Sequence, residues 1–218
     1  MGSRTVHVDA RRLPRWVAGF GERHGAVTLA RGDGAVVLSG ADEAVASLEV
    51  PFPPLSLDAA PDPVAALAAH ALAPRAVAVL LVRRGGYAVA LVDGGAVVAS
   101  KVGSRYVQGR TAAGGWSQQR FARRREGQTA ALVEAAAATA HRVLSSSSSS
   151  SSPPPPPAAA WLVTGGDRAL VDRVLADPRL KALAALPRER HLDVGDPRSD
   201  DVRALPERLR AVRVTLTP

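Results

Sequence analysis

Three short apolar segments joined by two tight, glycine-containing turns constrain the fold of this 218-residue chain more than any other feature. The segments are Ala76–Val82, Tyr87–Val92 and Ala96–Val102, and the turns between them are Arg83–Gly86 and Asp93–Gly95. Turns this short join antiparallel neighbours, because parallel strands need a much longer crossover. The sequence therefore predicts a three-stranded antiparallel meander.

Helices and strands alternate after the meander. The order of three strands followed by helix, strand, helix, strand and helix is the ribonuclease-H-like arrangement, a mixed α/β sheet with helices on both faces. The predicted elements are an alanine-rich helix over Glu126–Leu144, a strand over Ala160–Thr164, a helix capped by Asp167, a helix opened by Asp177 and Pro178, a strand over Arg190–Val194, a helix over Ser199–Leu209 and a last strand over Val212–Leu216.

Residues 1–73 are predicted to form a small N-terminal α+β region. Its elements are a helix over Asp9–Glu22, short strands before Pro51, and a helix that Asp62 and Pro63 open. The second domain then covers 74–218. Within it, eight serines and five prolines at 145–157 form a low-complexity tract, which we expect to be a disordered insertion.

Composition narrows the classes of function. The net charge is +8, and 26 of the 28 basic residues are arginines, whose planar guanidinium suits phosphate. The absence of cysteine excludes disulfides and thiolate metal sites. The histidines lack ligand spacing, and the predicted strands Ala76–Val82 and Ala160–Thr164 lack the carboxylates that a ribonuclease-H-type nuclease needs for its metal ions. We therefore expect no cofactor, and metal-dependent cleavage is the weaker alternative.

The sequence predicts neither a signal peptide nor a transmembrane segment. Residues 1–13 lack the apolar core of a signal peptide, and no apolar run approaches the length that crosses a bilayer. We expect a cytoplasmic, monomeric protein that makes no membrane contact.

The segment Lys101–Arg125 concentrates positive charge. It contains seven cations and no aspartate or glutamate, and three of the chain's aromatic residues lie among these cations. Cations interleaved with rings that can stack on bases are typical of proteins that bind single-stranded or terminal RNA. The cations are Lys101, Arg105, Arg110, Arg120, Arg123, Arg124 and Arg125, and the aromatic residues are Tyr106, Trp116 and Phe121.

A solvated loop that leads into a basic helix start is the structural alternative. It fits less well, because three arginines directly before a helix that begins near Glu126 oppose the dipole of that helix. A phosphate backbone would compensate for them. The pattern therefore favours an RNA contact, with Trp116 as a residue that stacks on bases.

Two glycines and two glutamines form the centre of this segment. Gly114 and Gly115 adopt backbone angles that other residues resist and allow a ligand to approach the main chain closely. Gln118 or Gln119 can then project from the tip. A glutamine amide is neutral and cannot act as a general base near neutral pH, but it can orient a water while nearby N–H groups stabilise an oxyanion. Such a site suits hydrolysis of an activated ester.

The segment resembles the tip of the Vms-like release factor family, peptidyl-tRNA hydrolases of ribosome rescue that are related to the middle domain of eukaryotic class-I release factors. The family's tip is Gly-x-Ser/Ala-Gln between basic residues, and Gly115, Ser117 and Gln118 match it. The arginine- and alanine-rich composition is similar to that of an actinobacterial member. The resemblance implies a release-factor middle-domain-like core over roughly Ala76–Pro218.

The resemblance also implies partners and roles. The domain would bind rRNA of the large ribosomal subunit and peptidyl-tRNA, and Gln118 would place water at the ester of a stalled nascent chain. Gly115 and Ser117 would shape the tip, and Gln119 is the other candidate for the acting glutamine. Two alternatives stay open: a non-catalytic ribosome- or RNA-binding protein that uses the arginines as an anchor, and cleavage of tRNA near its 3′ end.

Overall fold

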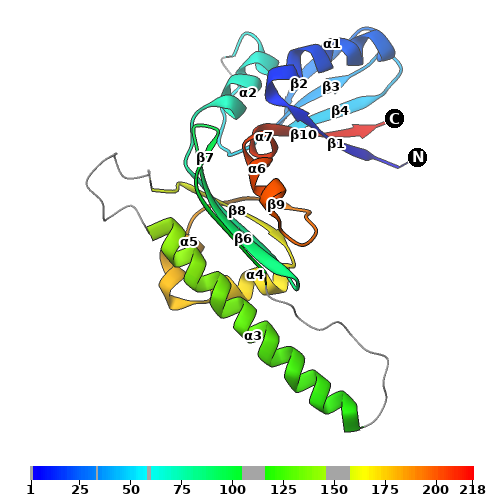
Figure 1. Cartoon of the computed structure of the whole chain (residues 1–218). Helices are drawn as coiled ribbons and strands as arrows, with labels where there is room; N and C mark the ends of the chain where they lie inside the picture. The colour runs from blue at the N-terminus through cyan, green and yellow to red at the C-terminus, as the bar shows by residue number, and fades with distance from the viewer. Residues whose placement is uncertain (1, 33, 58–59, 105–115, 146–157) are drawn as a thin grey trace. The chain divides into compact units, whose positions relative to one another are not determined.

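The chain forms two compact units, which are residues 1–74 with 206–218, and residues 75–205. Each unit contains one five-stranded sheet (Figure 1). The computed structural model describes the backbone of residues 2–32, 34–57, 60–104, 116–145 and 158–218, and the side chains of the same ranges apart from 116–122.

The first unit is an antiparallel sheet with helices on one face. The strand order is β1-β10-β4-β3-β2, and every neighbouring pair is antiparallel. The strands are β1 (Arg4–Asp9), β2 (Thr28–Gly32), β3 (Ala35–Ser39), β4 (Val45–Glu49) and β10 (Ala211–Thr217). The short helix η1 (Ala10–Arg12) and the helices α1 (Leu13–His24) and α2 (Pro63–Leu72) supply apolar side chains, such as Phe20 and Leu67, that pack on the sheet.

Local capping signals set the ends of these helices. Asp62 accepts hydrogen bonds from the N–H groups of Val64 and Ala65, so it is the N-cap of α2 as predicted. Gly25 has a φ of 78° and follows the last residue of α1. The strand β1 was not predicted, because Asp9, taken as the start of a helix, instead ends the strand and caps η1.

The last strand corrects the predicted second domain. Val212–Leu216 was expected to complete the domain over 74–218, but β10 pairs with β1 and β4 in the first unit. Residues 206–218 therefore belong with the N-terminal segment. Alternating apolar residues identify a strand, and only the tertiary pairing identifies its neighbours. The expected insertion at 145–157 lies, apart from Ser145, outside the described residues.

The second unit has the predicted mixed sheet. Its strand order is β7-β6-β5-β8-β9, with the first three strands antiparallel and with β8 and β9 parallel to β5. This order confirms the meander and the α/β class. The strands are β5 (Val77–Arg83), β6 (Gly86–Asp93), β7 (Ala96–Ser104), β8 (Trp161–Gly166) and β9 (Arg188–Leu192).

Helices cover both faces of this sheet. Even-numbered residues of β5, such as Leu80, pack against α3 (Trp116–Ser145), α4 (Arg168–Leu175), η3 (Pro178–Leu180) and α5 (Lys181–Ala184). The alternate residues Val79 and Leu81 are also buried, and α6 (Ser199–Arg203) contacts β6 and β7. A further helix, α7 (Leu205–Arg210), follows α6. In the described part of the chain no helix has the length and apolarity needed to cross a membrane.

Candidate nucleic-acid interface

The helix α3 projects from its own unit. It has 30 residues, which corresponds to a length of about 45 Å. Among its described side chains, those between Arg123 and Ala131 are exposed or half-buried, and Leu132 is the first that is buried. Figure 1 shows that the end of α3 that leaves the sheet is its amino-terminal end. None of the described side chains of α3 before Leu132 is therefore part of the buried core.

The predicted catalytic residues lie at the free end of this helix. Ser117, Gln118 and Gln119 belong to the first turn of α3, directly after Trp116, and Gly115 lies outside the described residues. The backbone N–H groups of a first helical turn have no partner within the helix and carry partial positive charge. The main chain at Gln118 therefore presents hydrogen-bond donors at the end of a projecting helix.

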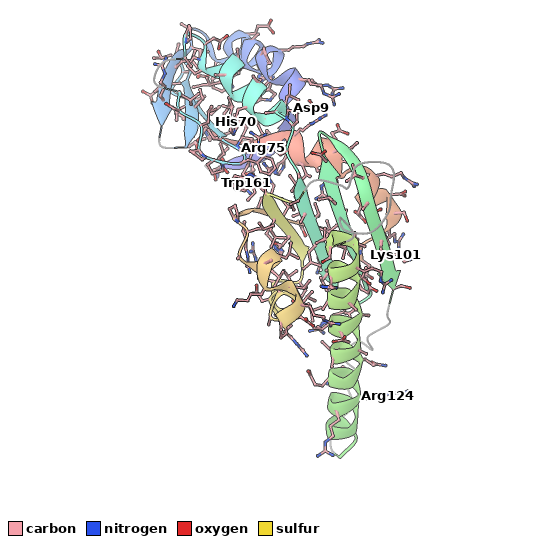
Figure 2. All side chains as sticks on the ribbon, turned by 90° about the vertical axis from the view of Figure 1, so that its left-hand side faces the viewer. Asp9, His70, Arg75, Lys101, Arg124 and Trp161 are labelled. Atoms are coloured by element: carbon pink, nitrogen blue, oxygen red, sulfur yellow. The ribbon has the colours of Figure 1, made fainter. Side chains whose placement is uncertain are left out.

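The predicted RNA-binding residues follow the same helix. Arg120 is on its second turn, and Arg105 and Arg110 lie outside the described residues. The side chains of Arg123 and Arg124 are exposed and that of Arg125 is half-buried, while Lys101 is exposed near the end of β7. Figure 2 shows Arg124 far out on α3. Lys101 lies on β7, which continues to Ser104, and pairs with Val89 of β6.

The predicted start of the long helix is wrong. The helix was expected to begin near Glu126, with three arginines at its positive end, but it begins at Trp116. Arg123–Arg125 therefore lie about two turns inside the helix, where the dipole effect has decayed. The charge of these arginines remains unbalanced for another reason, which is that their side chains have no partner among the described residues.

Ion pairs divide the cations of the second unit into two groups. Arg173 of α4 binds Glu126 of α3, and Arg179 of η3 binds Glu134 of α3, with N–O distances of 2.8 Å in both pairs. In the described part of residues 75–205, eight cationic side chains have no such partner. They are Arg84, Lys101, Arg123, Arg124, Arg125, Arg168, Lys181 and Arg198.

The net charge of the protein is also confined to this unit. The other unit contains nine arginines and nine acidic residues and is therefore neutral, so the whole charge of +8 lies in residues 75–205. An unbalanced positive unit with a basic projecting helix is the electrostatic pattern of a nucleic-acid-binding domain.

The Actinobacteria/chloroflexi VLRF1 release factor family matches residues 75–215, which is more than half of the chain. The chain belongs to this family. The predicted relationship to actinobacterial Vms-like release factors is confirmed, and the match begins at the first residue of the second unit. No curated protein matches the chain.

We call the second unit, residues 75–205, the release-factor domain. Among its described residues, no group of three histidine, aspartate or glutamate side chains could hold a metal ion. His191 instead hydrogen-bonds Thr164 through Nδ1 at 2.9 Å and the carbonyl oxygen of Gly166 through Nε2 at 3.0 Å. Because Nε2 donates to the carbonyl, this histidine joins β9 to β8. Its role in the domain is structural.

A buried contact joins β6 to the part of α3 that packs on the sheet, and no local sequence pattern predicts it. The hydroxyl group of Tyr87 on β6 hydrogen-bonds Oγ1 of Thr139 on α3 at 3.1 Å. Gly103 faces Tyr87 across the β6–β7 pair, and a Cβ at Gly103 would lie 2.4 Å from Cζ of the tyrosine ring. Tyr87 thus fixes both the end of β7 and the buried half of α3, the two elements that flank 105–115.

This contact predicts a steric coupling between Gly103 and Tyr87. We expect Gly103→Ala to destabilise the domain by about 2 kcal/mol, because the buried ring cannot move away without breaking its bond to Thr139. In a Tyr87→Ala background the same substitution should cost little. A double-mutant cycle by urea unfolding measures the coupling. Equal costs in both backgrounds would show that the ring does not limit Gly103.

The ion pairs of Arg179 predict a pH effect. Side-chain and backbone hydrogen bonds from Arg179 lower the pKa of Asp177 to about 2. An unfolded aspartate titrates near 3.9, so Asp177 contributes stability that is full above about pH 4 and is lost as the pH falls through about 2. Asp177→Asn keeps the capping oxygen and should lower the Tm at pH 6 more than at pH 2. A difference in Tm that is independent of pH would exclude the charge as the cause.

Proposed function

We propose that this protein is a ribosome-associated peptidyl-tRNA hydrolase that releases stalled nascent chains on the large ribosomal subunit. The observation that carries the proposal is the position of Gln118, in the first turn of a helix whose amino-terminal half leaves a release-factor domain. A narrow projection is what a catalytic residue needs to reach a bond enclosed by RNA. The unpaired arginines behind it supply contacts to phosphate.

The chemistry follows from a neutral amide beside backbone donors. Gln118 orients a water that attacks the carbonyl carbon of the ester, and N–H groups of the first turn of α3 stabilise the oxyanion. The bond between the carbonyl carbon and the ribose oxygen breaks, and a proton from the water passes to that oxygen through the substrate's own hydroxyl groups. The products are a tRNA with a free terminal hydroxyl and a peptide carboxylic acid, which loses the second proton of the water to solvent and becomes a carboxylate.

The other site residues have positioning and binding roles in this proposal. Gly115 and Ser117 shape the backbone at the tip, and Gln119 is the alternative for the acting amide. The remaining residues hold rRNA and tRNA, by phosphate contacts or, for Trp116, by stacking. They are Lys101, Arg105, Arg110, Trp116, Arg120, Arg123, Arg124 and Arg125.

One assay tests the proposal. Purified large subunits that carry a labelled peptidyl-tRNA are mixed with the full chain, and free peptide is separated from peptidyl-tRNA. We expect release of the peptide with the tRNA intact. A peptide still joined to a short 3′-terminal oligonucleotide, together with a shortened tRNA that carries no peptide, would favour cleavage near the 3′ end. Binding to the subunits with neither product would favour a non-catalytic anchor, which the unpaired arginines also support.

A further inference from the structure

Four strands of the release-factor domain end at one edge of its sheet. Because β5, β7, β8 and β9 run in the same direction, their last residues lie together, and we call this the carboxyl edge. Arg84 is in the turn directly after β5, and Arg168 is the first residue of α4, two positions after β8 ends. Lys101 lies near the end of β7, and the projecting half of α3 starts beyond this edge.

Two ion pairs place Arg168 level with the basic turn of α3. The pairs Arg173–Glu126 and Arg179–Glu134 follow the same order along both segments, so the segment that contains α4 and η3 runs in the same direction as α3. Arg168 precedes Arg173 by five residues, or about 7.5 Å of helix. It is therefore level, along the helix axis, with the part of α3 that precedes Glu126 and contains Arg123–Arg125.

Three carboxylates near this edge each have a hydrogen-bond or ion-pair partner. Asp167 accepts a hydrogen bond from the N–H of Leu170 at 3.2 Å, and Asp196 accepts one from the N–H of Gly85 at 3.3 Å. Asp193 lies 3.8 Å from the guanidinium group of Arg83. The side chains of Arg84 and Arg168 are exposed and have no partner among the described residues.

At the opposite edge of the sheet, most cations are paired with carboxylates. Arg179 precedes β9 and Arg188 is its first residue, at the amino ends of the parallel strands, and both are paired with carboxylates. Lys181 is the one cation there, among the described residues, that has no partner. Six of the eight unpaired cations of the domain are therefore on α3 or at the carboxyl edge, and Arg198 directly precedes α6.

We propose that the RNA-binding surface continues from α3 onto the carboxyl edge, where Arg84 and Arg168 bind phosphates of the RNA that the projecting helix enters. The inference rests on the proposed function for the identity of the RNA. The binding itself requires only a phosphodiester backbone. Guanidinium groups that are already paired with carboxylates elsewhere in the domain bind phosphate less well. The surface joins the rigid sheet to the helix and so sets the direction in which α3 points into its target.

Arg168 also separates binding from folding. A cation at the first position of a helix is disfavoured by the helix dipole, so removing it should leave the Tm of the protein equal or slightly higher. A loss of RNA binding by Arg168→Gln then cannot be a result of unfolding. Lys181→Gln removes one unpaired cation at the amino edge and is the matched control.

The experiment measures binding of the full chain to a labelled single-stranded RNA that ends in CCA, between about 50 and 200 mM salt. We expect Arg84→Gln and Arg168→Gln each to weaken binding several-fold and to reduce the slope of log K against log salt by about 0.7, with the double variant near 1.4. Lys181→Gln should change neither quantity. The same four proteins are then tested for binding to large ribosomal subunits by sedimentation.

A double variant with wild-type affinity and slope would overturn the inference, as would an equal loss in Lys181→Gln, which would mean that net charge alone matters. Release assays on the same proteins separate the two proposals. If the wild type releases no peptide but the double variant binds RNA more weakly, the hydrolase proposal fails and this surface stands. If the wild type releases peptide and the double variant binds and releases equally well, this inference alone fails.

Discussion

Replacing Gln118 with alanine should lower the rate of peptide release by about 100- to 1,000-fold, the usual cost of losing one group that positions or stabilises a transition state. The substitution removes the amide that orients water and leaves the backbone of α3 intact, because alanine is the best helix former. Binding to the large subunit should therefore stay within about twofold of the wild type, since the phosphate contacts of the arginines are unchanged.

Gln119→Ala is the matched control for this result. It removes the same chemical group from the next position of the same helical turn, about 100° around the helix axis. We expect release to be nearly normal with Gln119→Ala and almost absent with Gln118→Ala. The reverse result would transfer the role to Gln119. Normal release by both single variants and by the double variant would mean that no glutamine of this turn acts in the reaction.

Gly166→Ala should destabilise the release-factor domain by about 3 kcal/mol or more. Gly166 has a φ of 89°, which costs a residue with a Cβ about 1–2 kcal/mol, and a Cβ there would lie 2.2 Å from the carbonyl oxygen of Val82. That oxygen also accepts the N–H of Asp167 at 2.8 Å. The clash therefore adds the cost of separating β8 from β5.

Gly94 offers a comparison, because its φ is also positive but the space around it is free. Its φ is 52° and a Cβ there would meet nothing within 4 Å, so Gly94→Ala should cost only about 1 kcal/mol. Urea unfolding is followed by the fluorescence of Trp161 at the start of β8, with Trp16 and Trp116 replaced by phenylalanine in all proteins. Similar costs at Gly166 and Gly94 would show that the contact with Val82 does not limit the structure.

The local elements of the second unit could be predicted because each has a local cause. Two short glycine-containing turns between apolar runs determine an antiparallel meander, and Asp167 is the N-cap of α4. The start of α3 could not be predicted in this way. The turns before Glu126 are rich in arginine and lack an apolar face, so no hydrophobic periodicity marks them as helical.

Pairing over long sequence distances explains the other errors. The sequence predicts β10 as a strand, but its pairing with β1 and β4 depends on a sheet formed by residues more than 150 positions away. The contact of Tyr87 with Gly103 and Thr139 has the same character. Each of these residues is unremarkable in its own segment and acquires its role from the two elements that it faces.

The sequence by itself determined the class of the fold, the basic and glycine-bearing segment, and the relationship to release factors. These depend on turn chemistry, hydrophobic periodicity and a short motif, all of which act within a few residues. Only the tertiary structure decided that the segment's second half is a projecting helix, that β10 leaves the domain, and which cations are free. A cation is neutralised by whichever carboxylate the fold brings within about 4 Å, and that distance is not encoded in any local pattern.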